Sequence, residues 1–412
     1  MQLFIYNLGI NLYFFAARFL ALFNAKAKKF IHGRRSLFTD LSDAVIQNEK
    51  YIWVHCASLG EFEQGRPLIE GFKEKFPGFK IILTFFSPSG FEIRKNYELA
   101  DIVSYLPKDS INNAGKFLSI VNPSLAVFVK YEFWYHFLNE MSRKDIPVFL
   151  VSAVFRKNQP FFGLMSNLYR KMLTFYDEIF VQDEESCYLL KSINMGQVII
   201  AGDTRFDRVL KIAQNKSNLP EIESWAQKKQ CFIAGSIWPS DLSILIDIIE
   251  QFDFKFILAP HEPTENFIKS LQQKIDKKTT LFSQNNVINN EDILIIDTIG
   301  HLSTLYQLAD FAYIGGAFHN GLHNILEAAV HGMPVFVGKS HQNSKFKEVL
   351  QMVKAGGCFE IADSNDLKAH LNLFAEAPKL KNETAMISSN YVCSKAGASE
   401  KILDYSKLYL SS

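Results

Sequence analysis

The chain has 412 residues, of which 48% are hydrophobic and 21% charged, and its net charge is +1. Because a single hydrophobic core stops growing well below this length, we expect two domains of ordinary size. The five cysteines are scattered and form no Cys-x-x-Cys pair, which argues against a disulfide framework and a zinc site and indicates a reducing compartment.

Residues 1–35 are predicted to form a membrane-associated helix with a basic flank. Residues 3–23 are mostly apolar and about long enough to cross a bilayer. Asn7, Asn11 and Arg18 interrupt them, within about 40° of one another on a helix. An arginine at mid-membrane costs at least ~2.5 kcal/mol, which favours a helix lying in the membrane interface or against the protein. A spanning helix and an ordinary terminal core helix stay open as alternatives.

The charge distribution predicts an anionic membrane surface as a partner. Residues 1–39 hold six basic and no acidic side chains, which leaves 38 basic against 43 acidic residues in the rest. Nucleic acid is not expected, because no basic stripe runs along the globular part. A cleaved signal peptide is not expected either, because no basic segment precedes the apolar run. The basic residues after Phe23 predict a body on the cytoplasmic side of the membrane.

From Tyr51 onward, short apolar runs alternate with amphipathic stretches, as in parallel sheets covered by helices on both faces. We predict a Rossmann-like domain over 36–210, a polar linker over 211–229, a second Rossmann-like domain over 230–395 and a C-terminal helix over 396–412 that packs back on the first domain. The predicted strands are 51–56, 80–84, 125–129, 147–151, 178–182, 198–202, 231–234, 255–259, 293–297, 311–314 and 334–337.

The first strand ends in a short turn that leads into a helix, with Glu61 where the helix begins. Ligands of open α/β sheets bind at the carboxyl ends of the strands, so Glu61 stands where chemistry usually happens. The same residues fit a capping box, in which Ser58 and Glu61 satisfy N–H groups of the first turn, a feature worth about 1 kcal/mol. From this turn alone, capping is the favoured interpretation.

A second candidate site follows the strand 311–314. Gly315 and Gly316 would let backbone N–H groups approach a phosphate, a helix opens near Asn324, and Glu327 in its first turn would accept hydrogen bonds from a ribose. A tight turn in which Glu327 merely complements the helix dipole is an equal alternative. His319 and His323 lie four residues apart in a loop and not on a helix, so no metal is expected there.

Taken in order, these motifs make the chain similar over nearly its whole length to the 3-deoxy-D-manno-octulosonic acid (Kdo) transferases of lipopolysaccharide synthesis. The residues that carry the resemblance are Gly33-Arg34-Arg35, Trp53-x-His55-x-Ala57-Ser58-Leu59-Gly60-Glu61, Thr84, Ser87-Pro88-Ser89-Gly90, Leu106-Pro107-x-Asp109, Glu132-Phe133-Trp134, Tyr313-Ile314-Gly315-Gly316 and Gly321-Leu322-His323-Asn324-Ile325-Leu326-Glu327-Ala328.

The resemblance implies a GT-B glycosyltransferase, with two Rossmann-like domains facing across a cleft. It implies transfer of Kdo from CMP-Kdo to the 6′-hydroxyl of the lipid A precursor, with inversion, at the cytoplasmic face of the inner membrane. Glu61 would be the general base, and Glu132 would support the transition state unless it is only a solvent-facing carboxylate at a helix start. Arg205 would be a third catalytic residue: it stands where the family commonly has a lysine, and it could bind a phosphate or carboxylate through two hydrogen bonds. No cofactor is expected, because helix dipoles and basic side chains usually stabilise the leaving phosphate in this fold.

The resemblance also implies a donor site, although 259–264 lacks the arginines that the family tends to have there. Two alternatives stay open, namely another GT-B transferase of lipid-linked sugars and a non-catalytic, membrane-tethered nucleotide-sugar-binding module. A Rossmann dehydrogenase is disfavoured, because its glycine fingerprint is absent. The implied substrate- and CMP-binding residues are Ser58, Gly60, Pro260, His261, Gly315, Gly316, Ala317, Asn324, Ile325, Leu326 and Glu327.

Overall fold

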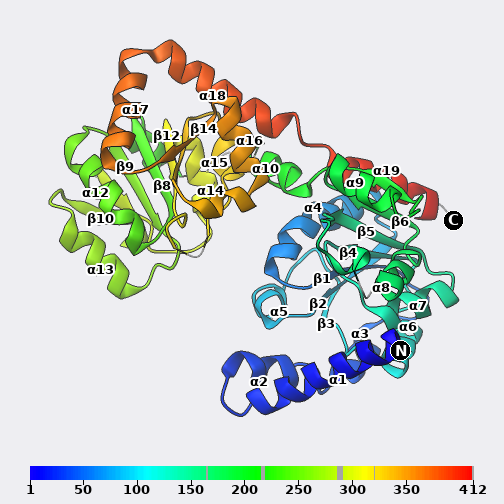
Figure 1. The fold of residues 1–412 in the computed structure, drawn as a ribbon. Helices are drawn as coiled ribbons and strands as arrows, with labels where there is room; N and C mark the ends of the chain where they lie inside the picture. Colours follow the sequence, from blue (N-terminus) through cyan, green and yellow to red (C-terminus); the bar gives the residue numbers. More distant parts are fainter. Residues whose placement is uncertain (164–165, 215–218, 285–290, 320, 411–412) are drawn as a thin grey trace. The chain divides into compact units, whose positions relative to one another are not determined.

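The computed structural model describes residues 1–163, 166–214, 219–284, 291–319 and 321–410. It divides the chain into two compact units, each built on its own sheet (Figure 1). Unit 1 comprises Met1–Arg208 and Ala396–Ser412, and unit 2 comprises Val209–Lys395. The predicted cleft between the domains stays a prediction.

Unit 1 contains a seven-stranded, all-parallel sheet in the order β3-β2-β1-β4-β5-β6-β7. The order changes direction between β1 and β4, and this switch point is where ligands of such sheets bind. The strands are β1 (Lys50–Cys56), β2 (Phe79–Phe85), β3 (Ile102–Tyr105), β4 (Leu125–Val129), β5 (Val148–Ala153), β6 (Glu178–Val181) and β7 (Val198–Ile200).

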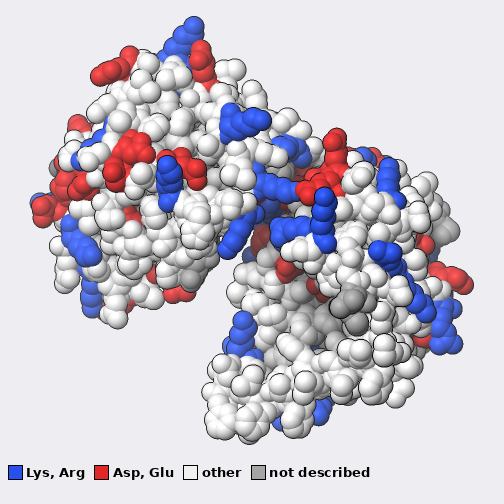
Figure 2. Space-filling view, viewed as in Figure 1, with Lys and Arg blue, Asp and Glu red and all other residues white. Residues whose placement is uncertain are grey.

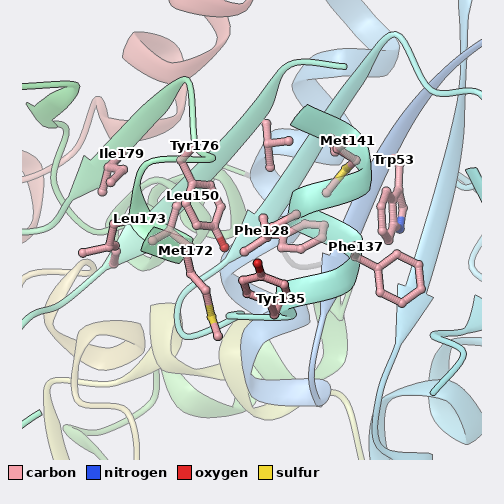
Figure 3. Close-up of a cluster of buried hydrophobic side chains, with 14 of the residues drawn as sticks. Trp53, Phe128, Tyr135, Phe137, Met141, Leu150, Met172, Leu173, Tyr176 and Ile179 are labelled. Carbon is pink, nitrogen blue, oxygen red and sulfur yellow. The ribbon is translucent and has the colours of Figure 1, made fainter. Parts of the chain in front are cut away.

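Helices cover both faces of this sheet. α4 (Leu59–Lys75) and α19 (Ala398–Leu410) pack on one face, and an aromatic-rich core with Trp53, Phe128 and Phe137 fills the other (Figure 3). The remaining helices are α1 (Gln2–Leu20), α2 (Ala25–His32), α3 (Leu37–Ala44), α5 (Pro88–Arg94), α6 (Ile111–Val121), α7 (Tyr135–Arg143), α8 (Ser166–Leu173), α9 (Glu184–Lys191) and α10 (Thr204–Gln214), which continues into unit 2.

Unit 2 repeats this plan with the strand order β10-β11-β9-β8-β12-β13-β14, so its switch point lies between β8 and β12. The prediction of two parallel α/β sheets is confirmed. The strands are β8 (Cys231–Ile237), β9 (Lys255–Pro260), β10 (Thr279–Leu281), β11 (Ile293–Ile295), β12 (Phe311–Ile314), β13 (Val335–Gly338) and β14 (Cys358–Ile361). The helices are α11 (Pro220–Ala226), α12 (Leu242–Gln251), α13 (Glu265–Lys274), α14 (Leu302–Leu305), α15 (Leu326–Ala329), α16 (Lys347–Ala355), α17 (Ser364–Glu376) and α18 (Pro378–Cys393).

The predicted linker 211–229 holds the end of α10 and the short helix α11, while 215–218 lie outside the described residues. Trp225 of α11 is buried and donates its indole N–H to the carbonyl of Glu291 at 2.7 Å. At the other end of unit 2 the chain returns to unit 1, where Asp207 accepts hydrogen bonds from the backbone N–H groups of Gly397 (2.6 Å) and Ser399 (2.9 Å). Asp207 thereby fixes the start of α19.

Helix α1 lies on unit 1 with its polar stripe turned toward the protein. Asn7 contacts the His136 ring at 2.7 Å, and Lys108 donates a hydrogen bond to Asn11. The Tyr6 hydroxyl donates to Asp109 Oδ2 at 2.5 Å and accepts the N–H of Tyr135. Burial raises the pKa of the Asp109 carboxyl.

The opposite side of α1 is apolar and exposed. The helix is long and apolar enough to cross a bilayer, with a mean hydropathy of 1.4, yet only 6% of its most apolar window is buried. Phe4, Phe15 and Phe19 are each more than 60% exposed. Asn7 and Asn11 of the predicted polar stripe contact unit 1, whereas Arg18 is exposed. A helix with one polar and one exposed apolar side is typical of a membrane interface.

We predict that Tyr6→Phe loosens α1. The variant removes a donor to the buried Asp109 carboxylate, which costs roughly 1–3 kcal/mol, while it keeps the ring. Hydrogen exchange of the α1 amides should accelerate. The matched control is Tyr13→Phe, the same change on the same helix, where the ring contacts to Phe14, Phe30 and Phe86 are retained. Equal exchange in the two variants would show that the Tyr6 hydroxyl does not hold the helix.

Candidate functional site

Glu61 lies in the first turn of α4, directly after β1 at the switch point of unit 1. Ser58 occupies the N-cap position with an extended backbone, and its hydroxyl makes no capping hydrogen bond to a backbone N–H. It donates instead to the Glu61 carboxylate. The capping-box interpretation is therefore wrong in this structure, because the serine orients the glutamate side chain. Gly60 between them is exposed, which leaves the space before the helix open.

Glu132 follows β4 and is only 4% exposed. Its Oε2 atom accepts hydrogen bonds from His55 Nε2 at 2.9 Å and Trp134 Nε1 at 2.6 Å. The hydroxyl of the buried Tyr176 donates a hydrogen bond to the backbone carbonyl of Glu132. The alternative of a solvent-facing carboxylate is wrong, because Glu132 belongs to a buried polar network at the switch point.

His55 completes this network; it is part of the motif that carries the family resemblance, but no role was predicted for it. The ring is fully buried, and its Nδ1 lies 2.8 Å from Thr84 Oγ1, which also accepts the indole N–H of Trp53 at 2.7 Å. His55 and Thr84 are direct partners in the β1–β2 register, and Trp53 lies two residues before His55 on the same face. The family motifs contain each of these residues, but their contacts can be recognised only once the strand pairing is known.

The two candidate carboxylates follow neighbouring strands. Glu61 comes after β1 and Glu132 after β4, and these two strands pair in parallel, so both residues lie at the carboxyl ends of adjacent strands. Burial, and then the negative charges of Glu132 and Glu61, raise the pKa of the Cys56 thiol at the end of β1 well above its usual value. A shared active site of Glu61 and Glu132 stays a prediction.

Arg205, the third predicted catalytic residue, begins α10 and pairs with Asp203. Its Nε and NH2 atoms lie 2.8 Å and 2.7 Å from Asp203 Oδ2. The adjacent Thr204 donates to the carbonyl of Gln64 at 2.7 Å, which ties the start of α10 to α4. Arg205 is thus beside the helix that carries Glu61, with its charge shared with a carboxylate.

At the switch point of unit 2, the two predicted phosphate-binding glycines already use their N–H groups. Gly315 donates to the carbonyl of Gly235 at 2.9 Å, and Gly316 donates to Asp241 Oδ2 at 3.2 Å. A Cβ on Gly315 would lie 2.6 Å from the Ser236 carbonyl oxygen, and Gly316 has φ +99°. In this structure the glycines are required by a tight strand-to-loop turn.

Asp241 organises this turn and was not predicted from the sequence. It is completely buried, and it also accepts the Trp238 N–H at 2.8 Å and the Tyr313 hydroxyl at 3.0 Å. Burial raises its pKa. No motif marks a buried carboxylate one turn after a strand, so only the fold reveals it.

Aromatic rings gather in front of Asp241. His261 directly follows the buried Pro260 and stacks on His323, with 4.1 Å between the ring centroids. The ring centroids of His319 and Trp238 lie 4.3 Å apart. Trp238 Nε1 donates to His323 Nε2 at 3.1 Å. The predicted donor-site histidine therefore joins a cluster that also contains Trp238, His319 and His323. Among the described residues, no group of three metal-ligating side chains converges.

The other predicted donor residues differ in what they can offer a ligand. Ala317, Ile325 and Leu326 are buried, so only their backbone groups can reach one. Asn324 accepts the Leu326 N–H at 3.1 Å and donates to Glu327 Oε1 at 3.2 Å, which holds the Glu327 carboxylate at the start of α15.

A family model described as 3-Deoxy-D-manno-octulosonic-acid transferase (kdotransferase) matches residues 16–208. A 3-deoxy-D-manno-octulosonic acid transferase of Haemophilus influenzae is 24% identical over 410 residues, covering 95% of both chains. One of Rickettsia felis is 28% identical over 333 residues, covering 78% of this chain and 70% of the relative.

Solved structures share the fold at low identity. A UDP-N-acetylglucosamine 2-epimerase has a TM-score of 0.60 at 13% identity, covering 88% of this chain and 97% of its own. The Neisseria meningitidis UDP-GlcNAc 2-epimerase bound to UDP-GlcNAc has a TM-score of 0.58 at 15% identity, covering 86% and 98%.

Two parallel seven-stranded sheets, each with polar groups at its switch point, define a GT-B-type protein. Within that class the chain is a glycosyltransferase. It is similar to the Kdo transferases, as the match of residues 16–208 to their family model and the two relatives named above show.

We predict that unit 2 loses stability as the pH falls from 6.5 to about 4. Burial, and then the nearby His261, lower the pKa of His323 from 6.5 to about 4. The unfolded chain therefore binds more protons in this window. His323→Gln keeps an acceptor for Trp238 but removes the titration, so its thermal midpoint should fall less than that of the wild type. His341→Gln, an exposed histidine of the same unit, is the control and should follow the wild type. Parallel curves for all three proteins would refute a lowered pKa at His323.

Proposed function

We propose that this protein transfers Kdo from CMP-Kdo to the 6′-hydroxyl of the lipid A precursor, with Glu61 as the general base. The observation that carries the proposal is the Glu61 carboxylate, oriented by Ser58 at the switch point of unit 1. The family match spans this region, and the relatives are named for Kdo transfer.

In the proposed reaction Glu61 accepts the proton of the acceptor hydroxyl. The hydroxyl oxygen then forms a bond to the anomeric carbon of Kdo from the side opposite the donor phosphate. The bond between that carbon and the phosphate oxygen breaks, CMP leaves with the bonding electrons, and the configuration inverts. A base placed within hydrogen-bond reach of the hydroxyl contributes typically 10²–10⁴-fold to such a step.

Glu132 is proposed to support the transition state from a fixed position. Its carboxylate is held by His55 and Trp134, so it costs little reorganisation when positive charge develops on the sugar. Arg205 is proposed to stabilise anionic groups of the donor while it shares its charge with Asp203.

Unit 2 is proposed to bind the CMP part of the donor at the switch point between β8 and β12. The Trp238 and His261 rings stack on each other, so a base would bind by opening or extending this aromatic stack. The Glu327 carboxylate offers an acceptor for ribose hydroxyls. Since the N–H groups of Gly315 and Gly316 are engaged, phosphate binding there would require those bonds to be exchanged or other groups to be used.

The proposed location is the cytoplasmic face of the inner membrane. The exposed apolar side of α1 and the absence of acidic residues from 1–39 support binding to an anionic membrane surface. The acceptor is a lipid, so an enzyme held at the membrane meets it in two dimensions.

The test compares membranes that carry the wild type, Glu61→Gln or Glu74→Gln, with CMP-Kdo generated in situ and the tetra-acylated lipid A precursor as acceptor. Glu61→Gln should lower kcat by about 10²–10⁴-fold, because it removes the base and keeps the shape. Glu74→Gln, the same change at an exposed site on α4, should keep full activity. The mass of the product gives the number of Kdo units added.

Three other outcomes would contradict the proposal. Equal activity in Glu61→Gln and the wild type would remove Glu61 as the base. Transfer of a different activated sugar and not of Kdo would indicate another GT-B transferase. Tight donor binding without transfer by any protein would indicate a binding module.

Ser58→Ala tests the positioning role of Ser58 separately. Without the hydroxyl the Glu61 side chain loses its orientation, so kcat should fall about tenfold while KM for the acceptor stays unchanged. A change in KM alone would instead place Ser58 in substrate binding.

A further inference from the structure

A cavity of about 510 Å³ lies in unit 1 between α1, α2, α3 and the loop after β3, and the proposed reaction does not use it. Four permanently basic side chains line it, and no Asp or Glu is among its described lining residues. They are Arg18, Arg34, Arg35 and Lys108. Such an excess of positive charge around one cavity predicts an anionic ligand.

Arg34 supplies the second observation. Its three donor groups bond to the backbone carbonyls of Leu106 (2.8 Å), Phe30 (2.8 Å) and Phe86 (2.6 Å). The guanidinium also lies 3.9 Å from the centroid of the Phe30 ring. Burial lowers its pKa to about 9, so it remains charged at neutral pH. In the part of the chain that the structure describes, its positive charge has no carboxylate partner, which an anion in the cavity would provide.

Arg18 and Arg35 are exposed and form no ion pair with a described carboxylate. Their guanidinium groups are free to form the paired hydrogen bonds that phosphate oxygens accept. Lys108 is already oriented by its bond to Asn11. Arg34 therefore holds the backbone around the cavity in place and contributes positive charge, while Arg18 and Arg35 supply hydrogen-bond donors for the ligand.

The remaining walls are apolar and continue onto the exposed side of the helices. Phe14, Leu22 and Phe38 line the cavity, and Leu22 and the neighbouring Phe23 are more than 70% exposed. In Figure 2 the visible surface of α1 and α2 is largely uncharged, with isolated basic side chains and no acidic patch. A ligand that fits this arrangement has an anionic head and an apolar tail.

We propose that this cavity is a lipid-phosphate site, which takes the phosphomonoester head group of a membrane lipid and so fixes the depth and rotation of α1 and α2 at the membrane surface. The site needs neither donor nor Glu61, so it goes beyond the proposed function. A lipid held here would place the C-terminal edge of the unit 1 sheet at a defined height, because Arg34 bonds directly to the carbonyl of Phe86 after β2.

The test measures partition of the full-length protein onto phosphatidylcholine vesicles that carry either phosphatidic acid or a carboxylate lipid at equal zeta potential. The wild type should prefer phosphatidic acid about tenfold, the effect of one charge-assisted hydrogen bond. Arg18→Gln/Arg35→Gln should abolish this preference. The matched control, Lys28→Gln/Lys29→Gln, removes two charges from α2 outside the cavity and should keep it.

Several outcomes would overturn the inference. If the wild type partitions equally onto both vesicles, or if both double variants lose the preference alike, the binding is general surface electrostatics. If millimolar inorganic phosphate abolishes the preference, the cavity takes free phosphate and not a lipid head group. Because no donor is present in these measurements, a failure here is distinguishable from a failure of the proposed transfer reaction.

Discussion

A buried carboxylate must find hydrogen-bond donors, and at Glu132 that requirement connects much of unit 1. Its donors are the side chains of His55 on β1 and Trp134, and His55 is in turn fixed by Thr84 on β2. These side chains therefore add a second connection between the carboxyl ends of three strands that already pair through their backbones. Removing one of these partners would leave a buried charge without a hydrogen-bond partner, and the free energy of folding would then lose far more than one hydrogen bond contributes.

The same network reaches the N-terminal helices. The Trp134 ring lies 4.8 Å from the Phe86 ring, Phe86 packs at 5.2 Å on Phe30, and its carbonyl accepts a bond from Arg34. A continuous series of side-chain contacts thus connects the Glu132 carboxylate with the apolar N-terminal helices. Unit 2 uses the same device, since the buried Asp241 holds the loops after β8 and β12 in the way that Glu132 holds those of unit 1.

The sequence predicts the central strands well and the edge strands poorly. β1, β4 and β5 are buried on both faces, so they read as continuous apolar runs. Three of the four edge strands, β3, β10 and β14, were not predicted, because they are short and only partly buried; the fourth, β7, is equally short but was predicted from its apolar run. Glu61 could be placed from its turn alone, but its contact with Ser58 could not, because capping and side-chain pairing share one spacing. Asp241 and His55 depend on strand pairing, which one sequence does not display.

The return of the chain at Asp207 has a consequence for biosynthesis. Phe149 and Phe180 of unit 1 pack against Tyr409 and Tyr405 of α19, which follows the whole of unit 2 in the sequence. At about 5–20 residues per second, a ribosome needs roughly 10–40 s to make the intervening segment. During that interval the part of the unit 1 sheet face that α19 covers stays exposed, while α4 already covers the rest. The order of synthesis therefore gives α1, the helix proposed to bind the membrane, time to reach a bilayer before the domain behind it is complete.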